Sequence, residues 1–202
     1  MRTIVSLAIL LIVCASGTGC ATIRTTDPPR TATEQFLLSG AAARAIEQLS
    51  SESLRDRKVF IDSTYLGSSQ TANEYAFLIG ELRAKLLLSG IRLVPKREDA
   101  QILLELRSGG LGIDRLEFLL GIPALYLPQA TSSTVPIATP ELAIIKSTKQ
   151  RGYASVAYVA YWADTGEVVA HSGTFIGRTT REDWWILGTG PRTVGDIPPA
   201  EK

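Results

Sequence analysis

Residues 153–162, YASVAYVAYW, form the stretch that decides the fold. Apolar side chains occupy both alternating sets of positions, which is typical of a strand with both faces covered, in the middle of a sheet. Asp164, Thr165 and Gly166 follow and predict a tight turn, because Gly166 can take a positive φ. Residues 167–175 then return as the antiparallel partner. The C-terminal part of the chain therefore predicts a β-hairpin.

A strand–helix–strand unit precedes this hairpin. Residues 58–62, KVFID, are short and rich in β-strand formers, and they predict a strand. Thr71 and Glu74 have the spacing of a capping box, and apolar residues recur at helical spacing up to Leu86. Gly90 supplies a left-handed stop, and residues 91–94 predict a second strand. Such a unit forms a right-handed crossover in which the two strands are parallel.

Two further elements complete the expected fold. Thr31 and Glu34 make another capping box and predict a helix over residues 34–49, while residues 101–107 alternate as a third strand. Residues 141–146 are a further candidate strand. The fold class expected is α/β (α+β): a mixed sheet of about five to six strands, two main helices packed on it, one βαβ crossover and a C-terminal antiparallel hairpin. We expect a single domain over residues 34–190 and a frayed tail over residues 191–202.

Residues 108–140 lack strong periodicity and predict a long loop. Loops of this length inside a compact domain are uncommon and are often functional. A segment with structure that the pattern does not reveal is the competing interpretation.

The N-terminus predicts an export signal. Residues 4–15 are an apolar run that follows Arg2. A membrane-spanning helix needs about 20 such residues, so the run is too short to span but fits a secretory signal. Small residues 16–19 then lead into Cys20, and this arrangement resembles the lipobox of bacterial lipoproteins. The resemblance implies a signal peptide over residues 1–19, lipid attachment at Cys20 and a flexible tether over residues 20–33.

Two residues near Cys20 qualify the lipoprotein interpretation. Gly17 stands where that family usually has Leu, so the alternative is ordinary signal-peptidase cleavage after Gly17, which would leave Cys20 a free thiol. Ala21 stands where lipoproteins retained at the inner membrane typically carry Asp. By this resemblance, we expect an anchor at the periplasmic face of the outer membrane.

Charge and composition limit the possible partners. Removal of residues 1–19 takes away Arg2 and no acidic residue, which leaves 20 basic residues against 20 acidic ones. A nearly neutral chain argues against nucleic-acid binding, which needs a clearly basic face, and against strong attraction to anionic lipid headgroups. About 180 residues remain, enough for one domain with a proper core.

Catalytic motifs are missing from the sequence. His171 is the single histidine, and no HExxH, CxxC, GxSxG or Walker motif occurs. Asp114 with Glu117, and Glu182 with Asp183, are carboxylate pairs without a companion nucleophile. We therefore expect no enzymatic activity, no metal site and no cofactor.

Three segments together carry a family resemblance: the strand–helix–strand unit, the strand that opens AQILL at residues 100–104, and the hairpin YWADTGEVV at residues 161–169. They resemble the periplasmic α/β domain of the CsgG and LpoB lipoproteins and the amino-terminal domain of TolB. The whole chain also resembles a family of uncharacterised bacterial lipoproteins. The resemblance implies a scaffold that assembles with copies of itself or with an envelope partner. The CsgG pore is not expected, because residues 116–127 show no apolar–polar alternation and Pro136 and Pro140 interrupt the return strand.

The leading hypothesis is a membrane-anchored binding or assembly module without enzymatic activity. The candidate contact residues are Asp114, Leu119 and Tyr126 in the predicted loop and the adjacent Trp184 and Trp185. The alternative for the tryptophans is structural: one indole closes the edge of the core, while its neighbour packs under the C-terminal tail. The alternative function is a periplasmic protein that binds a small apolar ligand or lipid, with residues 116–127 covering a cavity.

Overall fold

The computed structural model describes residues 30–66, 72–124, 126–127, 137–138 and 140–197. The chain divides into one unit over Met1–Thr31 and a second over Ala32–Lys202. The predicted signal peptide over residues 1–19, the predicted lipid-attachment residue Cys20 and residues 21–29 of the predicted tether lie outside the described residues. The fold below is that of the second unit. Its buried apolar side chains all lie between Leu37 and Ala160, so this unit holds a complete core.

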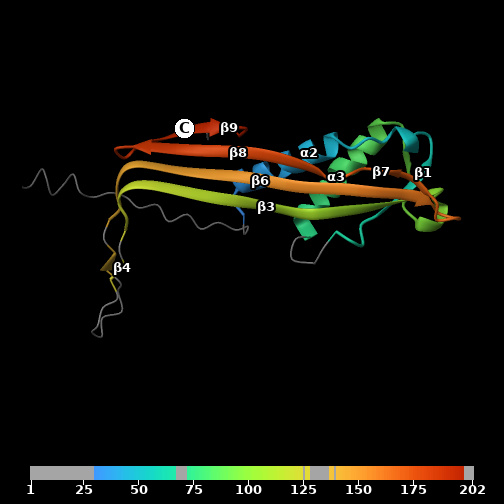
Figure 1. The fold of residues 1–202 in the computed structure, drawn as a ribbon, viewed down its shortest axis with the longest axis horizontal. Helices are drawn as coiled ribbons and strands as arrows, with labels where there is room; N and C mark the ends of the chain where they lie inside the picture. The colour runs from blue at the N-terminus through green and yellow to red at the C-terminus, as the bar shows by residue number, and fades with distance from the viewer. Residues whose placement is uncertain (1–29, 67–71, 125, 128–136, 139, 198–202) are drawn as a thin grey trace, which may run out of the picture. The chain divides into compact units, whose positions relative to one another are not determined.

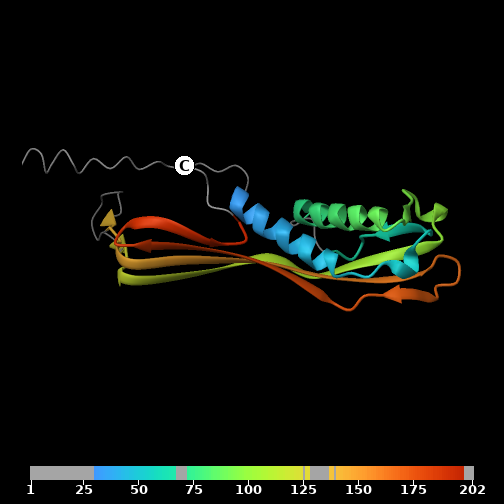
Figure 2. The ribbon, with the colours of Figure 1, turned by 90° about the horizontal axis from the view of Figure 1, so that it is seen from above.

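The second unit is an α+β fold in which two helices pack on a mixed seven-stranded sheet (Figures 1 and 2). The strand order is β2-β1-β3-β6-β8-β9, and β7 pairs with β6. In chain order the main elements are α2 (Ala32–Glu47), β1 (Lys58–Asp62), α3 (Ala72–Leu88), β2 (Arg92–Leu93), β3 (Ile102–Ile122), β6 (Leu142–Trp162), β7 (Val168–His171), β8 (Phe175–Ile186) and β9 (Thr189–Gly195). Short 3₁₀ turns lie at Glu52–Leu54 and Arg97–Asp99, and β4 (Tyr126–Leu127) pairs with β5 (Ile137–Ala138).

The strand–helix–strand prediction is confirmed. β1 pairs in parallel with both β2 and β3, and α3 connects β1 to β2. Gly90 follows α3 with φ 81°, the left-handed conformation that ends a helix. α2 begins at Ala32, directly after Thr31, so Ala32 and Thr33 belong to the helix and not to the predicted tether.

Small residues bring α2 against the sheet. Ala41 and Ala45 are fully buried on the helix, and Gly152 and Gly177 face it from β6 and β8. A Cβ at Gly177 would lie 1.9 Å from the carbonyl oxygen of Ala41, a separation that real side chains do not allow. The glycines therefore permit an approach that any larger residue would prevent.

The predicted loop over residues 108–140 is wrong for much of its length. β3 continues without a break through residues 108–122, and residues 142–162 form one strand, β6, antiparallel to it. β6 is central, as predicted from residues 153–162, because it pairs with β3, β7 and β8. The register shifts between Arg107 and Gly110, so the glycines of this region accommodate a β-bulge within a strand.

The C-terminal region also differs from the prediction. The turn at Gly166 is present, with φ 76°, but its partner strand β7 ends at His171. Phe175 then begins β8, which pairs with an earlier part of β6, and β9 returns antiparallel to β8. Residues 191–195 are therefore part of a strand and not of a frayed tail.

Candidate functional site

The strands of the sheet continue beyond the helices that cover its other half (Figures 1 and 2). We call this part the distal ribbon: residues 112–122 of β3, 142–152 of β6, 179–186 of β8, and β9. On the outer side of β3, β1 pairs only as far as Glu105. Among the described residues, no strand pairs with that edge from Leu106 to Ile122. The distal ribbon therefore presents a long free strand edge.

The position of α2 identifies the two faces of the ribbon. Gly152 and Thr179 are paired across β6 and β8, and both meet the carbonyl oxygen of Leu37 in α2. The Thr179 hydroxyl donates to that oxygen over 2.6 Å. Since paired residues share a face and alternate residues return to it, the face of every ribbon residue follows from the register. We call the side that faces α2 the helix face and the opposite side the open face.

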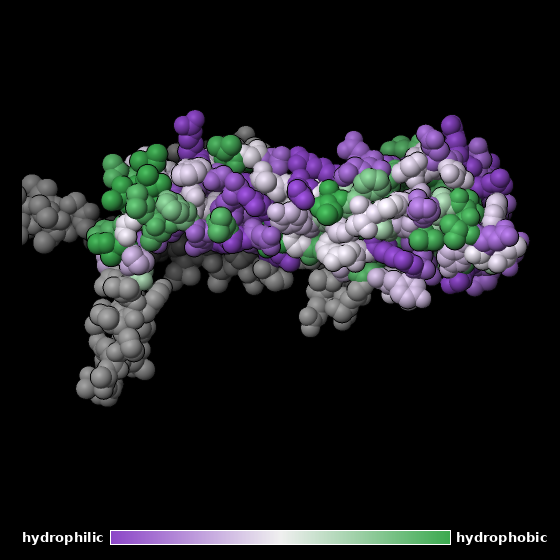
Figure 3. Space-filling model, in the orientation of Figure 1, coloured by the Kyte–Doolittle hydropathy of each residue, from purple (hydrophilic) through white to green (hydrophobic). Residues whose placement is uncertain are grey.

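The open face of the distal ribbon is apolar. Four alternate side chains of β3 point to this side, with exposed fractions between 50% and 66%. Neighbouring strands add further exposed apolar side chains. The set is Leu116, Phe118, Leu120, Ile122, Leu142, Trp184, Ile186 and Val194. Figure 3 shows hydrophobic side chains gathered at this end of the sheet, where β8 leads into β9.

The helix face of the ribbon is largely polar. Arg115 and Glu117 lie on this side of β3 and form a salt bridge of 2.7 Å. On β8, Arg181 and Asp183 are paired at 3.0 Å, and the Thr193 hydroxyl of β9 donates to Asp183. The exposed apolar side chains of the ribbon therefore gather on the open face, whereas the helix face carries these ion pairs.

The structure divides the predicted contact residues between these faces. Trp184 lies on the open face in one row with Phe118, and it is partly exposed. Leu119 and Trp185 lie together on the helix face on either side of Lys146, and both are half-buried. Neither tryptophan belongs to the core cluster, so neither closes the edge of the core, and the side chain of Trp185 lies next to Gly190 in the C-terminal strand β9.

Two other predicted residues have different placements. Asp114 lies exposed on the open face, opposite Arg151. Tyr126 lies in β4, and its side chain is outside the described set. Residues 112–122 of the predicted loop and the tryptophan pair thus belong to one ribbon, in which β3 and β8 lie on either side of β6.

Sequence reasoning missed the four apolar residues of β3 on the open face. Their signal was present as an alternation of apolar residues with Glu117, Leu119 and Gly121. Leu119 and Gly121 do not read as polar positions, so the segment gave no clear period of two. The strand was therefore not predicted, although the apolar side chains at alternate positions share one face. These side chains lie exposed along a strand.

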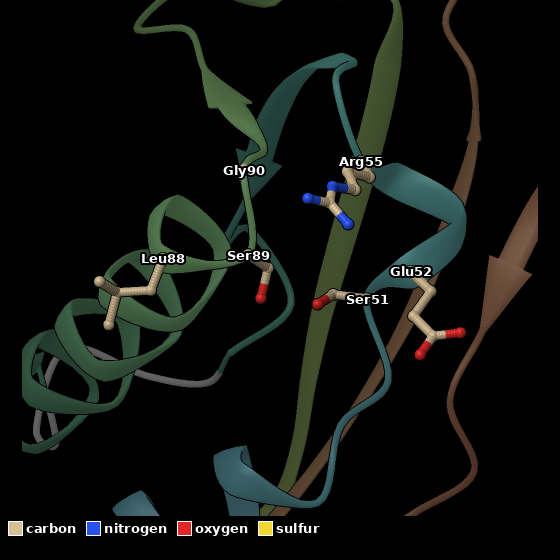
Figure 4. A pocket seen from close by; sticks show the side chains of 6 residues that line it. All are labelled: Ser51, Glu52, Arg55, Leu88, Ser89 and Gly90. Atoms are coloured by element: carbon tan, nitrogen blue, oxygen red, sulfur yellow. The ribbon is translucent and has the colours of Figure 1, made fainter.

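A shallow pocket of about 310 Å³ lies elsewhere, between the 3₁₀ turn after α2 and the end of α3 (Figure 4). It is lined by Ser51, Glu52, Arg55, Leu88, Ser89 and Gly90. In Figure 4 the hydroxyls of Ser51 and Ser89 face each other, while Leu88 and Glu52 point away. Neither serine is paired with a base, so the pocket contains no activated nucleophile.

Asp62 and Lys85 have shifted pKa values, and both make hydrogen bonds that stabilise local structure. Asp62 is nearly buried, and hydrogen bonds from the Thr64 hydroxyl and backbone N–H, with Arg97 nearby, lower its pKa. Burial lowers the pKa of Lys85, whose ammonium group donates to the carbonyl oxygens of Ile46 and Glu47 at the end of α2. His171 is exposed on β7. These contacts cap a helix and close a turn, and they bring no reactive groups together.

Asp114 and Glu117 point to opposite faces of β3, as do Glu182 and Asp183 on β8. In the part of the chain that the structure describes, no group of three or more His, Cys, Asp or Glu is placed to hold a metal ion. None of the helices described there is long and apolar enough to cross a membrane.

Comparison with known proteins and with family models identifies the family of the chain. No curated protein matches it. Residues 15–200 match the model of a family described as "Family of unknown function (DUF6655)". The match covers the whole sheet, both helices and all four strands of the distal ribbon. The chain therefore belongs to the DUF6655 family.

Proposed function

We propose that this protein is a lipoprotein of the bacterial envelope, anchored through Cys20, whose α+β domain is a non-enzymatic binding or assembly module. The signal-like residues 1–19 and the small residues before Cys20 support the anchor. At least two buried acyl chains are needed for stable attachment, and a lipoprotein cysteine carries three. The scaffold role agrees with the resemblance to the CsgG, LpoB and TolB domains, and we place the anchor at the periplasmic face of the outer membrane.

The distal ribbon is the observation that carries the binding role. A long free strand edge and a one-sided apolar face are features that a lone soluble domain normally avoids, because both promote association. Here they occur on the same four strands, away from the helices. An exposed edge can accept a strand from another protein through main-chain hydrogen bonds. We therefore assign the protein-contact surface to the free edge of β3.

In-cell photocrosslinking tests this assignment. A photoreactive amino acid at Leu119, on the helix face of β3, is expected to give a covalent adduct with an envelope protein or with a second copy. The same group at Leu88 is the matched control, because Leu88 is an exposed leucine on α3. Adducts of equal yield from both positions, or from Leu88 alone, would contradict the assignment.

Mass spectrometry of the N-terminal peptide from the same cells tests the anchor. We expect a peptide that begins at Cys20 and carries acyl chains. A peptide that begins at Thr18 with an unmodified thiol would show that the protein is not a lipoprotein, while leaving the ribbon's contact role open to the crosslinking result.

A further inference from the structure

The open face of the distal ribbon changes in character along its strands. The outermost rows hold Leu120, Ile122 and Ile186. The next row crosses the four strands in the order Phe118, Ser147, Trp184 and Arg192, and Arg192 of β9 is exposed. Apolar side chains from Leu116 to Ile122 span about 20 Å of strand at ~3.3 Å per residue.

A basic border follows the apolar rows on the same face. Arg151 and Arg178 are exposed there, and the guanidinium of Arg178 lies 5.8 Å from the centre of the Tyr153 ring. Lys149 is paired with Glu182 at 3.2 Å. Within the described residues, Arg151, Arg178 and Arg192 form no ion pair with a carboxylate. With Lys149 paired to Glu182, and Asp114 opposite Arg151 as the other carboxylate, these three arginines still leave an excess of positive charge on the open face, although the chain as a whole is close to neutral.

An apolar patch that includes a tryptophan, with one arginine beside it and two more at its inner end, is an arrangement that suits the interface of a bilayer. Apolar side chains enter the acyl region, Trp prefers the headgroup level, and basic side chains contact anionic headgroups. The helix face, with the Arg115–Glu117 and Arg181–Asp183 pairs, would remain in water.

A second copy of the chain suits this face less well. Two open faces stacked on each other would bury the three arginines against apolar side chains or against one another. Either outcome removes unpaired charges from water, which is costly. Anionic headgroups supply the missing negative charge without that burial.

We propose that the open face of the distal ribbon docks on a lipid bilayer that contains anionic phospholipids. The proposal rests on the function proposed above, which holds the domain beside a membrane, and it adds a second, reversible contact. The helix face and the free edge of β3 then remain available to a protein partner.

Vesicle flotation tests the docking with residues 22–202, which lack Cys20 and retain the complete core. This chain is expected to float with vesicles of mixed phosphatidylcholine and phosphatidylglycerol, and more weakly with phosphatidylcholine alone. The double variant Phe118→Ser/Ile186→Ser should lose roughly tenfold or more of the binding, because two apolar side chains leave the contact. Leu88→Ser, which removes an exposed leucine from α3, should bind like the unsubstituted protein.

Charge variants examine the border separately. Arg151→Gln/Arg192→Gln should bind mixed vesicles several-fold less well and leave binding to phosphatidylcholine nearly unchanged. Equal loss on both kinds of vesicle would contradict a role for anionic headgroups.

Fluorescence gives a measurement that needs no destabilising change. Lipids brominated in their acyl chains should quench the tryptophan emission of the unsubstituted chain, and Trp184→Phe should remove most of that quenching. Absence of flotation and quenching would overturn the proposal. Equal losses of vesicle binding in the Phe118→Ser/Ile186→Ser and Leu88→Ser variants would also overturn it. A third contrary result would be an unsubstituted chain that self-associates in solution and a Phe118→Ser/Ile186→Ser variant that is monomeric but binds vesicles normally, because a second copy would then be the partner of this face. The crosslinks from Leu119 do not depend on these results, so the proposed function can survive if the lipid contact fails.

Discussion

The same two strands pass through two different environments. In the first part of β3, Leu104 and Leu106 are fully buried beneath the helices, while Leu116 and Leu120 farther along are half exposed or more. Two features explain the difference. The extra residue of the bulge between Arg107 and Gly110 moves the even-numbered side chains of β3 from the helix face to the open face, and the strand then continues past the helices. A 21-residue strand extends about 70 Å at 3.3 Å per residue, whereas α2, with 16 residues, extends about 24 Å at 1.5 Å per residue. The bulge therefore turns the alternate apolar side chains of β3 away from the side of the helices, and the apolar character of the open face follows from this change of register.

The largest effect should come from shortening matched leucines in the two regions. Leu104→Ala should lower the free energy of unfolding by about 3 kcal/mol, because it leaves a cavity in the packed core. Leu120→Ala should change it by less than about 0.5 kcal/mol, since the side chain is already half exposed. Urea unfolding of the chain over residues 22–202 measures both values. Similar losses at the two positions would mean that the distal ribbon is covered in solution.

A pair of glycines sharpens the comparison at the point where α2 meets the sheet. Gly177→Ala should cost about 2 kcal/mol, because the new methyl group would overlap the backbone of α2 at Ala41. Gly110→Ala is the control, since a Cβ at that position meets nothing within 4 Å, and its effect should stay within about 0.5 kcal/mol. Thermal unfolding followed by circular dichroism would separate the two variants. If they were equally stable, α2 could not lie as close to β8 as the structure places it.

The helix-covered region could be predicted because its patterns are local. Residues 58–62, the helix that ends at Gly90 and the apolar run 153–162 each show their type within one short stretch. Their assembly into parallel and central strands follows from general rules of connection. This is also the region that contains the core, where burial enforces a clear pattern.

The distal ribbon could not be predicted in this way because its strands are defined by partners far along the chain. Residues 112–122 pair with residues 142–152, and Trp184 and Trp185 pair in turn with that segment. Gly109, Gly110 and Gly112 have the composition of a turn but lie in a bulged strand. Without a buried side to enforce polar and apolar positions, Leu119 and Gly121 obscured the alternation. The predicted contact residues therefore come from segments that the structure joins in one ribbon, but the sequence did not assign their faces.

The smallest effect concerns the link between the two regions, formed by Asp196 just after β9. Arg44 of α2 donates a hydrogen bond to Asp196 over 2.8 Å, and the backbone N–H of Thr180 donates to the same carboxylate. These contacts, with the Arg44 hydrogen bond as the largest cause, lower the pKa of Asp196. The stabilisation is therefore complete above the pKa of an unfolded Asp, about 3.9, and is lost as the pH falls through the lower folded value.

Asp196→Asn should accordingly lower the free energy of unfolding at pH 6 by less than about 1 kcal/mol, as expected for an exposed ion pair. At pH 2 the difference between the two proteins should shrink toward zero, because the native carboxyl is then becoming protonated as well. Urea unfolding at both pH values measures this difference, and the other carboxylates cancel because both proteins share them. A difference that stayed constant or grew at low pH would show that Asp196 acts through packing and not through its charge. Packing, and not charge, would then connect α2 to the end of β9. Changes in the stability of the helix-covered region would in that case also affect the stability of the distal ribbon.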